Sequence, residues 1–205
     1  MSYVVHEIFL TAQGEGANIG RVAVFCRFAG CNLWSGREAD RASAVCRFCD
    51  TEFVGGVRYD VDALANAIEA LWPADQSHRR VVFTGGEPLL QLDVALVSAM
   101  RGRGFWIAIE TNGTRPLPEA AIDWVCVSPK AGAKLLLDRA DELKLVVPQE
   151  GIAPGDFTDF PAQHHWLSPM DCPDRARHTA YAAEYCLAHP AWRLAIQAHK
   201  VWGLA

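Results

Sequence analysis

Short apolar segments alternate with amphipathic helical patterns along this chain, and that order constrains its fold more than any other feature. The segment Phe105-Trp106-Ile107-Ala108-Ile109 is apolar at every position, which suits a strand covered on both faces, as in a parallel sheet. The same reasoning predicts strands over residues 22–28, 80–84, 105–110, 123–128, 142–147, 165–168 and 192–196.

Three segments between these strands have the apolar spacing of helices with one buried face. The first covers residues 61–72, with Asp60 as its N-cap and Pro73 after its end. The second covers residues 89–100, before a pair of glycines. The third covers residues 173–189, and its predicted inward positions are Ala180, Tyr181, Tyr185 and Cys186.

Strands that alternate with helices favour an α/β fold with right-handed crossovers. The segments 111–123 and 128–141 are short and rich in Gly and Pro, so they leave little room for full helices. We therefore predict a reduced, open partial (β/α) barrel in place of eight complete strand–helix units. With 205 residues and no visible linker or repeat, residues 1–205 are expected to form one domain.

Composition and charge exclude several classes of protein. The chain is 51% hydrophobic and 21% charged, which is not typical of disorder. Its net charge of −5, from 19 basic and 24 acidic residues, gives no basis for expecting nucleic-acid binding. No apolar run approaches the roughly 18 residues of a membrane span. Residues 1–7 lack the pattern of a secretory signal, so we expect a cytoplasmic protein with no membrane partner.

The strongest chemical signal is a group of three cysteines, Cys31, Cys46 and Cys49, among seven in the chain. Three thiolates can hold a four-iron–four-sulfur cluster and leave one iron open to a substrate or cofactor. A structural zinc site with Cys26 as the fourth ligand is an alternative, as are unrelated buried thiols. No role is predicted for Cys126, Cys172 and Cys186.

A second signal follows a buried strand, where the chain reads Gly85-Gly86-Glu87-Pro88. Glycines let a ligand approach the backbone closely, and bare peptide groups can bond an amino group there. Taken alone, this segment fits a plain strand-to-helix turn equally well. Downstream of the three cysteines, it favours a cofactor-binding turn.

Three clustered cysteines followed by this turn resemble the radical S-adenosylmethionine (SAM) superfamily. The 14 residues between Cys31 and Cys46 depart from the more usual CxxxCxxC spacing and suit one family in it, 7-carboxy-7-deazaguanine synthase of queuosine and 7-deazapurine biosynthesis. The resemblance covers nearly the whole chain. It also rests on residues 9–16, 25–33, 49–51, 110–113, 128–130, 142–144 and 197–200.

The resemblance implies a small acidic substrate, 6-carboxy-5,6,7,8-tetrahydropterin. The planar guanidinium of Arg27 suits its carboxylate, and Thr84 stands at a strand end, where barrel enzymes place their chemistry. The substrate-binding residues that the family implies are Ala12, Gln13, Gly14, Glu15, Arg27, Thr84 and the chain end, Ala205.

The resemblance also implies the cofactors. Cys31, Cys46 and Cys49 would hold the four-iron–four-sulfur cluster in a loop at about residues 29–51 of a radical SAM domain, and Thr51 would bind magnesium. The residues implied for SAM are Phe48, Cys49, Asp50, Gly86, Glu87, Ser128, Pro129, Lys130, Ser168, Pro169, Met170 and Asp171.

The implied reaction is a radical ring contraction of the pterin with loss of ammonia, in which SAM is a reusable cofactor and the enzyme is a carbon–nitrogen lyase. The implied partners are an electron donor such as flavodoxin or ferredoxin and a second copy of the chain in a homodimer. Two alternatives stay open from the sequence: an activase of the same superfamily that acts on a glycine of a partner protein, and a zinc-stabilised binding module without catalysis.

Overall fold

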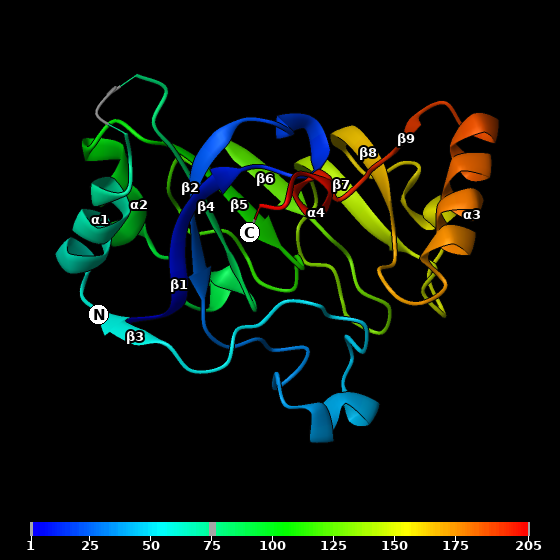
Figure 1. Ribbon diagram of the computed structural model, residues 1–205, viewed down its shortest axis with the longest axis horizontal. Helices are drawn as coiled ribbons and strands as arrows, with labels where there is room; N and C mark the ends of the chain where they lie inside the picture. Colours follow the sequence, from blue (N-terminus) through cyan, green and yellow to red (C-terminus); the bar gives the residue numbers. More distant parts are fainter. Residues whose placement is uncertain (1, 74–76, 205) are drawn as a thin grey trace.

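A computed structural model describes residues 2–73 and 77–204, and its centre is one nine-stranded sheet (Figure 1). The strand order is β3-β1-β2-β4-β5-β6-β7-β8-β9, and neighbours from β2 to β9 are parallel, whereas β1 is antiparallel to β2 and β3. The strands are β1 (Tyr3–Ala12), β2 (Val22–Phe28), β3 (Val57–Tyr59), β4 (Arg80–Gly85), β5 (Trp106–Thr111), β6 (Trp124–Val127), β7 (Ala140–Val147), β8 (Ala162–Pro169) and β9 (Trp192–Leu194).

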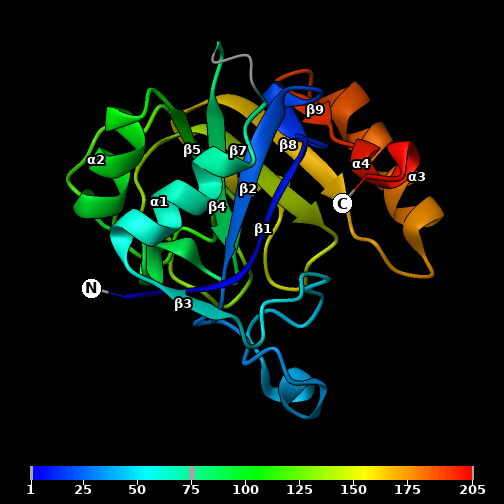
Figure 2. The same cartoon turned by 60° about the vertical axis from the view of Figure 1, so that its left-hand side comes forward.

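The sheet does not close on itself, so the predicted α/β fold with an open partial barrel is confirmed. The helices α1 (Val61–Ala70) and α2 (Val94–Gly102) lie at one end of the sheet and α3 (Arg175–Ala188) at the other, which Figure 2 shows clearly. The segments 112–123 and 128–139 are fully described and contain no helix, as their composition predicts. No helix among the described residues is long and apolar enough to cross a membrane.

Alternate residues of the parallel strands face opposite sides of the sheet, which decides where the core lies. On the helix side, Val81, Phe83, Ile107 and Ile109 are fully buried against side chains of α1 and α2. Burial of each such side chain stabilises the fold by about 1.5–3 kcal/mol. The opposite side carries the polar residues described below, so the sheet separates a hydrophobic core from a polar cavity.

The first helix agrees with its sequence signals, but the second differs from them. The Asp60 carboxylate accepts the backbone N–H of Ala63 at 2.8 Å, and α1 ends before Pro73. The single helix predicted over residues 89–100 is wrong: a short 3₁₀ helix, Pro88–Leu90, precedes α2, which begins only at Val94. The reason is Asp93, whose carboxylate caps α2 and also accepts the Tyr3 hydroxyl at 2.7 Å.

In α3, the predicted inward face is partly wrong. Ala180 and Tyr181 are exposed, whereas His178 and Ala182 are buried. Tyr185 and Cys186 do pack against the core, as expected. Apolar residues occur around the whole circumference of this helix, so only its packing against β8 and β9 decides which face is buried.

The sequence patterns predict neither β1 nor β3. The polar residues His6 and Glu7 interrupt the apolar alternation of β1, and its pairing with β2 shifts register between Val5 and Glu7. The strand β3 has three residues and contributes little pattern of its own. The strand β1 pairs with the edge of β2, and β3 in turn pairs with β1.

Candidate functional site

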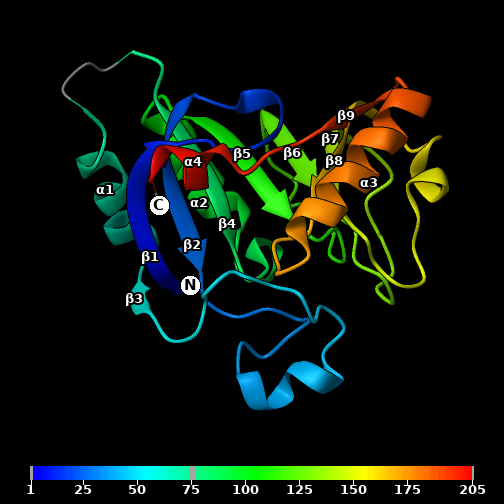
Figure 3. The same ribbon diagram turned by 45° about the vertical axis from the view of Figure 1, so that its right-hand side comes forward.

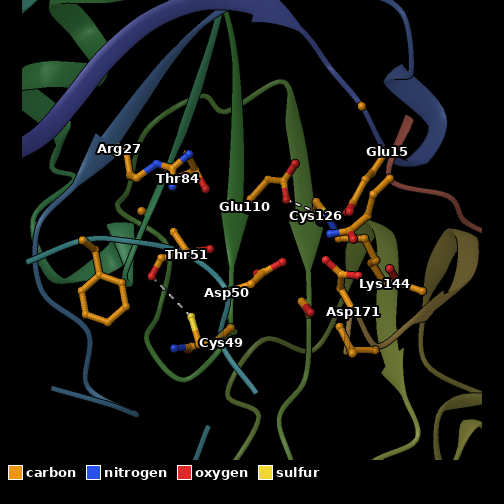
Figure 4. A pocket seen from close by; sticks show the side chains of 18 of the residues that line it. Glu15, Arg27, Cys49, Asp50, Thr51, Thr84, Glu110, Cys126, Lys144 and Asp171 are labelled. Carbon is orange, nitrogen blue, oxygen red and sulfur yellow. Dashed lines mark hydrogen bonds and ion pairs between the residues drawn. The ribbon is translucent and has the colours of Figure 1, made fainter. Parts of the chain in front are cut away.

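A cavity of about 410 Å³ opens at the carboxyl ends of the parallel strands, on the side of the sheet opposite α1 and α2 (Figure 4). Its wall combines strand residues with the loop that follows β2 and with residues near the end of the chain. That loop contains the 3₁₀ helix Glu38–Ser43 and projects from the end of the sheet toward which the parallel strands point (Figure 3). Parallel α/β sheets place their ligand sites at this end.

Most of the residues that sequence analysis predicts for the site line this one cavity. Among the described residues, Glu87 and Pro129 are outside the lining, and the predicted residue Ala205 lies outside the part of the chain that the structure describes. Those that line it are Ala12, Gln13, Gly14, Glu15, Arg27, Cys31, Cys46, Phe48, Cys49, Asp50, Thr51, Thr84, Gly86, Ser128, Lys130, Ser168, Pro169, Met170 and Asp171.

The three clustered thiols face the cavity together. The backbone N–H of Leu33 lies 3.4 Å from the Cys31 sulfur. The Cys46 thiol donates a hydrogen bond to Cys49, which together with Thr51 lowers the pKa of Cys49 to about 6 despite burial. The surroundings therefore favour the thiolate form, which binds metals, at Cys49. The hydrogen bond with Cys49 and burial raise the pKa of Cys46, and burial raises the pKa of Cys31.

The fourth candidate ligand, Cys26, does not reach the cavity. Its side chain is fully buried in the core on the helix side of the sheet, and burial raises the pKa of its thiol. Within the described part of the chain, no three His, Cys, Asp or Glu side chains converge enough to hold a single metal ion. Three thiols that share a wall without converging on one point fit a multi-iron cluster and not a mononuclear zinc site.

The glycine turn after β4 is fastened to the start of the cysteine loop. The Gly86 N–H donates to the carbonyl of Phe28 at 3.2 Å, and the Glu87 N–H donates to that of Gly30 at 2.9 Å. A Cβ on Gly86 would lie 2.1 Å from the Gly30 oxygen, so only glycine permits this approach. The turn and the cluster loop therefore hold a fixed relative position.

The side chain of Glu87, which sequence analysis predicts near SAM, does not line the cavity. Its fully buried carboxylate accepts the Thr111 hydroxyl at 2.7 Å and the backbone N–H groups of Asn112 and Leu89 at 2.8 and 3.0 Å. Burial raises the pKa of Glu87 although these hydrogen bonds oppose the shift. The carboxylate ties the turn to the end of β5 and does not face the cavity.

A buried ionic group forms the floor of the cavity, where Figure 4 shows Glu15, Glu110 and Lys144 together. The Lys144 Nζ lies 2.5 Å from Glu15 Oε2 and 2.8 Å from Glu110 Oε2. The Gln13 amide donates to the other oxygen of Glu110 at 2.8 Å. These contacts come from β5, from β7 and from the turn after β1, so they join distant parts of the chain.

Burial and ion pairing compete in this group. Burial by itself lowers the pKa of Lys144, but Glu110 and Glu15 outweigh it and raise that pKa well above its ordinary value. Burial likewise tends to raise the pKa of Glu110, but Lys144 outweighs it and the net pKa is lowered. Both shifts favour the ionised forms of Lys144 and Glu110 at neutral pH.

Two basic side chains complete the wall. Arg27 in β2 lies beside Thr84 in β4, and its Nε is 3.0 Å from Glu7, yet that N–H has no hydrogen-bond acceptor among the described residues. Lys130 donates to both oxygens of Ser128 at 2.7 Å, and burial lowers its pKa. Arg27 therefore has an ion-pair partner in Glu7, whereas Lys130 has no carboxylate partner among the described residues.

Sequence analysis assigned no role to Glu110, Lys144, Gln197, His199 or Lys200, although all of them line the cavity. The sequence does contain an indication for Glu110 and Lys144, because charged residues inside otherwise apolar parallel strands are typical of a functional site. The last three belong to a short segment before and within α4 (Ala198–Trp202), whose position no local pattern reveals.

Comparison with known proteins defines the class first. Residues 40–142, half of the chain, match the family model of the radical SAM superfamily. The chain is therefore a radical SAM enzyme, which uses a four-iron–four-sulfur cluster and SAM.

Relatives define the family within that class. The chain is 56% identical to a 7-carboxy-7-deazaguanine synthase from Bordetella pertussis and 57% identical to one from Bradyrhizobium diazoefficiens, in both cases over all of both proteins. The crystal structure of QueE from Escherichia coli superposes with a TM-score of 0.72 at 28% identity, covering 97% of this chain and 95% of that one. The chain belongs to the 7-carboxy-7-deazaguanine synthase family, which confirms the resemblance.

Proposed function

We propose that this enzyme converts 6-carboxy-5,6,7,8-tetrahydropterin into 7-carboxy-7-deazaguanine with loss of ammonia, in queuosine and 7-deazapurine biosynthesis. The observation that carries the proposal is full-length identity above 50% to relatives with that name. The cavity adds support, because it combines three thiols with cationic groups that suit a small acid.

The cluster and SAM belong on one side of the cavity. Cys31, Cys46 and Cys49 hold the cluster, which when bound supplies the electron that cleaves the carbon–sulfur bond of SAM. The backbone at Gly86 receives the amino group of SAM. The residues around the rest of SAM are Phe48, Asp50, Ser128, Lys130, Ser168, Pro169, Met170 and Asp171.

The substrate belongs on the other side, against the ionic floor. Arg27 binds the substrate carboxylate, since its guanidinium lines the cavity and its Nε–H lacks an acceptor. Gln13, Glu15 and Glu110 offer amide and carboxylate groups to the polar edge of the pterin, and Lys144 keeps the two carboxylates fixed. Preorganised groups of this kind orient the substrate and replace water around it.

Magnesium and the chain end complete the proposal. Thr51 lines the cavity and offers a hydroxyl oxygen, and Mg²⁺ commonly takes only one or two protein ligands beside substrate oxygens. Ala205 remains a proposed substrate contact, because the described chain ends at Leu204, close after the residues of α4 that line the cavity.

One continuous sheet supports a single domain over residues 1–205 with the cluster loop at about residues 29–51. The substrate is a small molecule, and we propose a homodimer that works in the cytoplasm and receives electrons from a flavodoxin or ferredoxin.

The decisive experiment is anaerobic reconstitution followed by incubation with the carboxypterin, SAM and a reductant. Mass spectrometry should show the deazaguanine product. The amount of SAM consumed should be much smaller than the amount of product formed, because SAM is reused. Arg27→Ala should raise the KM for the pterin about tenfold or more while SAM binding is retained. A pterin recovered unchanged from the wild-type enzyme would reject the proposed function.

A further inference from the structure

Lys200 joins three separate parts of the cavity mouth. Its Nζ donates to Gln197 Oε1 at 2.9 Å, to Asp50 Oδ2 at 3.2 Å and to Asp171 Oδ2. Asp50 follows the last cluster cysteine, Asp171 follows β8, and Lys200 belongs to α4. One ammonium group therefore connects the C-terminal helix to both sides of the proposed SAM site.

The charges around this ammonium favour the closed arrangement. Burial tends to lower the pKa of Lys200, but Asp171 and Asp50 outweigh it and raise that pKa. The pKa of Asp171 is lowered, mainly by its hydrogen bond from Lys200, and Arg175 lies 3.6 Å from its other oxygen. Both shifts favour the ionised pair of Lys200 and Asp171.

Little else holds α4 in place. Within this fully described helix only Ala198 is buried, and Val201 and Trp202 are exposed. The Ala198 N–H donates to the Gly14 carbonyl at 2.9 Å, in the proposed substrate motif. Because apolar burial contributes so little here, the polar contacts of Lys200 carry much of the attachment.

We propose that Lys200 is a positioning residue that keeps the C-terminal segment closed over the cavity and holds Asp50 and Asp171 in the orientation that binds SAM. This inference rests on the proposed function of the cavity. Loss of the ammonium should release the segment, admit water and weaken SAM binding.

The test compares the reconstituted holoenzyme with Lys200→Met, Lys200→Arg and Lys134→Met. Lys134 is an exposed lysine that does not line the cavity, so its variant controls for the loss of a positive charge. Lys200→Met should raise the KM for SAM about tenfold and increase the 5′-deoxyadenosine formed per product, with a smaller change in kcat. Lys200→Arg should restore most of the wild-type behaviour, and Lys134→Met should match wild type.

Hydrogen exchange gives a readout that does not depend on turnover. The amides of Ala198 and Leu204, which donate to Gly14 and His199, should exchange about tenfold faster in Lys200→Met than in wild type. In the exchange measurement alone, a double variant, Lys200→Met with Asp171→Asn, should release these amides no more than Lys200→Met does, because both changes break the same contact between α4 and the end of β8.

Either of two results would overturn the role of Lys200. In the first, Lys200→Met has a KM for SAM and an amide exchange rate that both stay within about twofold of wild type. In the second, Lys200→Met and Lys134→Met change these quantities equally. Failure of the proposed function looks different, because the wild-type enzyme would then make no deazaguanine while the exchange comparison still reports on Lys200.

Discussion

At the scale of single residues, this cavity depends on charges that are buried but paired. Lys144 lies between Glu15 and Glu110, and the side chains of these three residues are between 10% and 23% exposed. Desolvation of such groups is tolerated only when every partner is present. Removing one partner therefore has a larger effect than removing an exposed ion pair.

Lys144→Met is expected to lower the free energy of unfolding by about 3–5 kcal/mol, because two carboxylates lose their buried counter-ion. For a chain of this length that corresponds to a fall in melting temperature of roughly 10 °C. Lys134→Met, which removes an exposed lysine, should change stability by less than about 0.5 kcal/mol. Thermal unfolding followed by circular dichroism measures both, and equal melting temperatures would contradict the prediction.

The same ion pair predicts a dependence on pH. The pKa of Glu110 is lowered in the folded protein, so its contribution to stability is fully present above the ordinary glutamate pKa of about 4.3 and is lost as the pH falls through the lower folded value. Without Lys144, burial should raise the pKa of Glu110 instead. The difference in free energy of unfolding between wild type and Lys144→Met should therefore become smaller as the pH falls below the ordinary glutamate pKa of about 4.3. A difference that stays constant with pH would contradict this prediction.

At the scale of elements, the strand ends supply most of the cavity and one short helix covers it. Figure 3 shows α4 in front of the sheet, near β1 and β2. Its position depends on Gly14, since a Cβ there would lie 2.1 Å from the ring nitrogen Nδ1 and 2.8 Å from Cβ of His199. The absence of a side chain at one position thus determines how closely the helix approaches.

Gly14→Ala is expected to displace α4, because the new methyl group would meet the base of the His199 side chain and not merely its flexible tip. The fold should persist, while kcat/KM for the pterin should fall about tenfold or more. Gly155→Ala is the matched control, since a Cβ at that position meets no atom within 4 Å. Steady-state assays at equal cluster content measure the effect, and unchanged kinetics in Gly14→Ala would show that α4 does not matter here.

At the scale of the whole molecule, the side chains that pack around the sheet are different from those that pack within the cluster loop. The hydrophobic clusters that hold the sheet together consist of residues from the strands, from the helices and from the loops that connect them. The cluster loop has its own small packing, in which the Trp34 ring meets Phe53 edge-on at 5.6 Å and Arg41 lies 4.0 Å above the Trp34 ring. We therefore expect the sheet and its helices to fold without the metal.

Cys46→Ala should retain the far-ultraviolet circular dichroism of the wild type but lose iron and all SAM cleavage. Anaerobic wild-type protein should contain about four irons per chain and absorb near ~400 nm, and removing the cluster with a chelator should leave cooperative unfolding in place. Iron analysis and 5′-deoxyadenosine assays measure these outcomes. Normal SAM cleavage by the variant, or a wild type with about one zinc per chain, would contradict the ligand assignment.

The sequence by itself determined the features that depend on residues close together in the chain. The bounds of β2 agree with their prediction, the Asp60 cap starts α1, and two Gly-rich segments form no helix. The cysteine spacing and the turn at Gly86 pointed to the radical SAM class. Each of these features arises from residues that are neighbours in the chain, so a sequence pattern is enough to reveal it.

Only the tertiary structure decided which distant groups meet. The pairing of Lys144 with Glu15 and Glu110 spans 129 and 34 positions of the chain, and Lys200 reaches Asp50 across 150. The same holds for Glu87, which the sequence assigned to the cofactor but which folding turns toward the end of β5. Contacts of this kind are set by strand order and burial, which no local pattern contains.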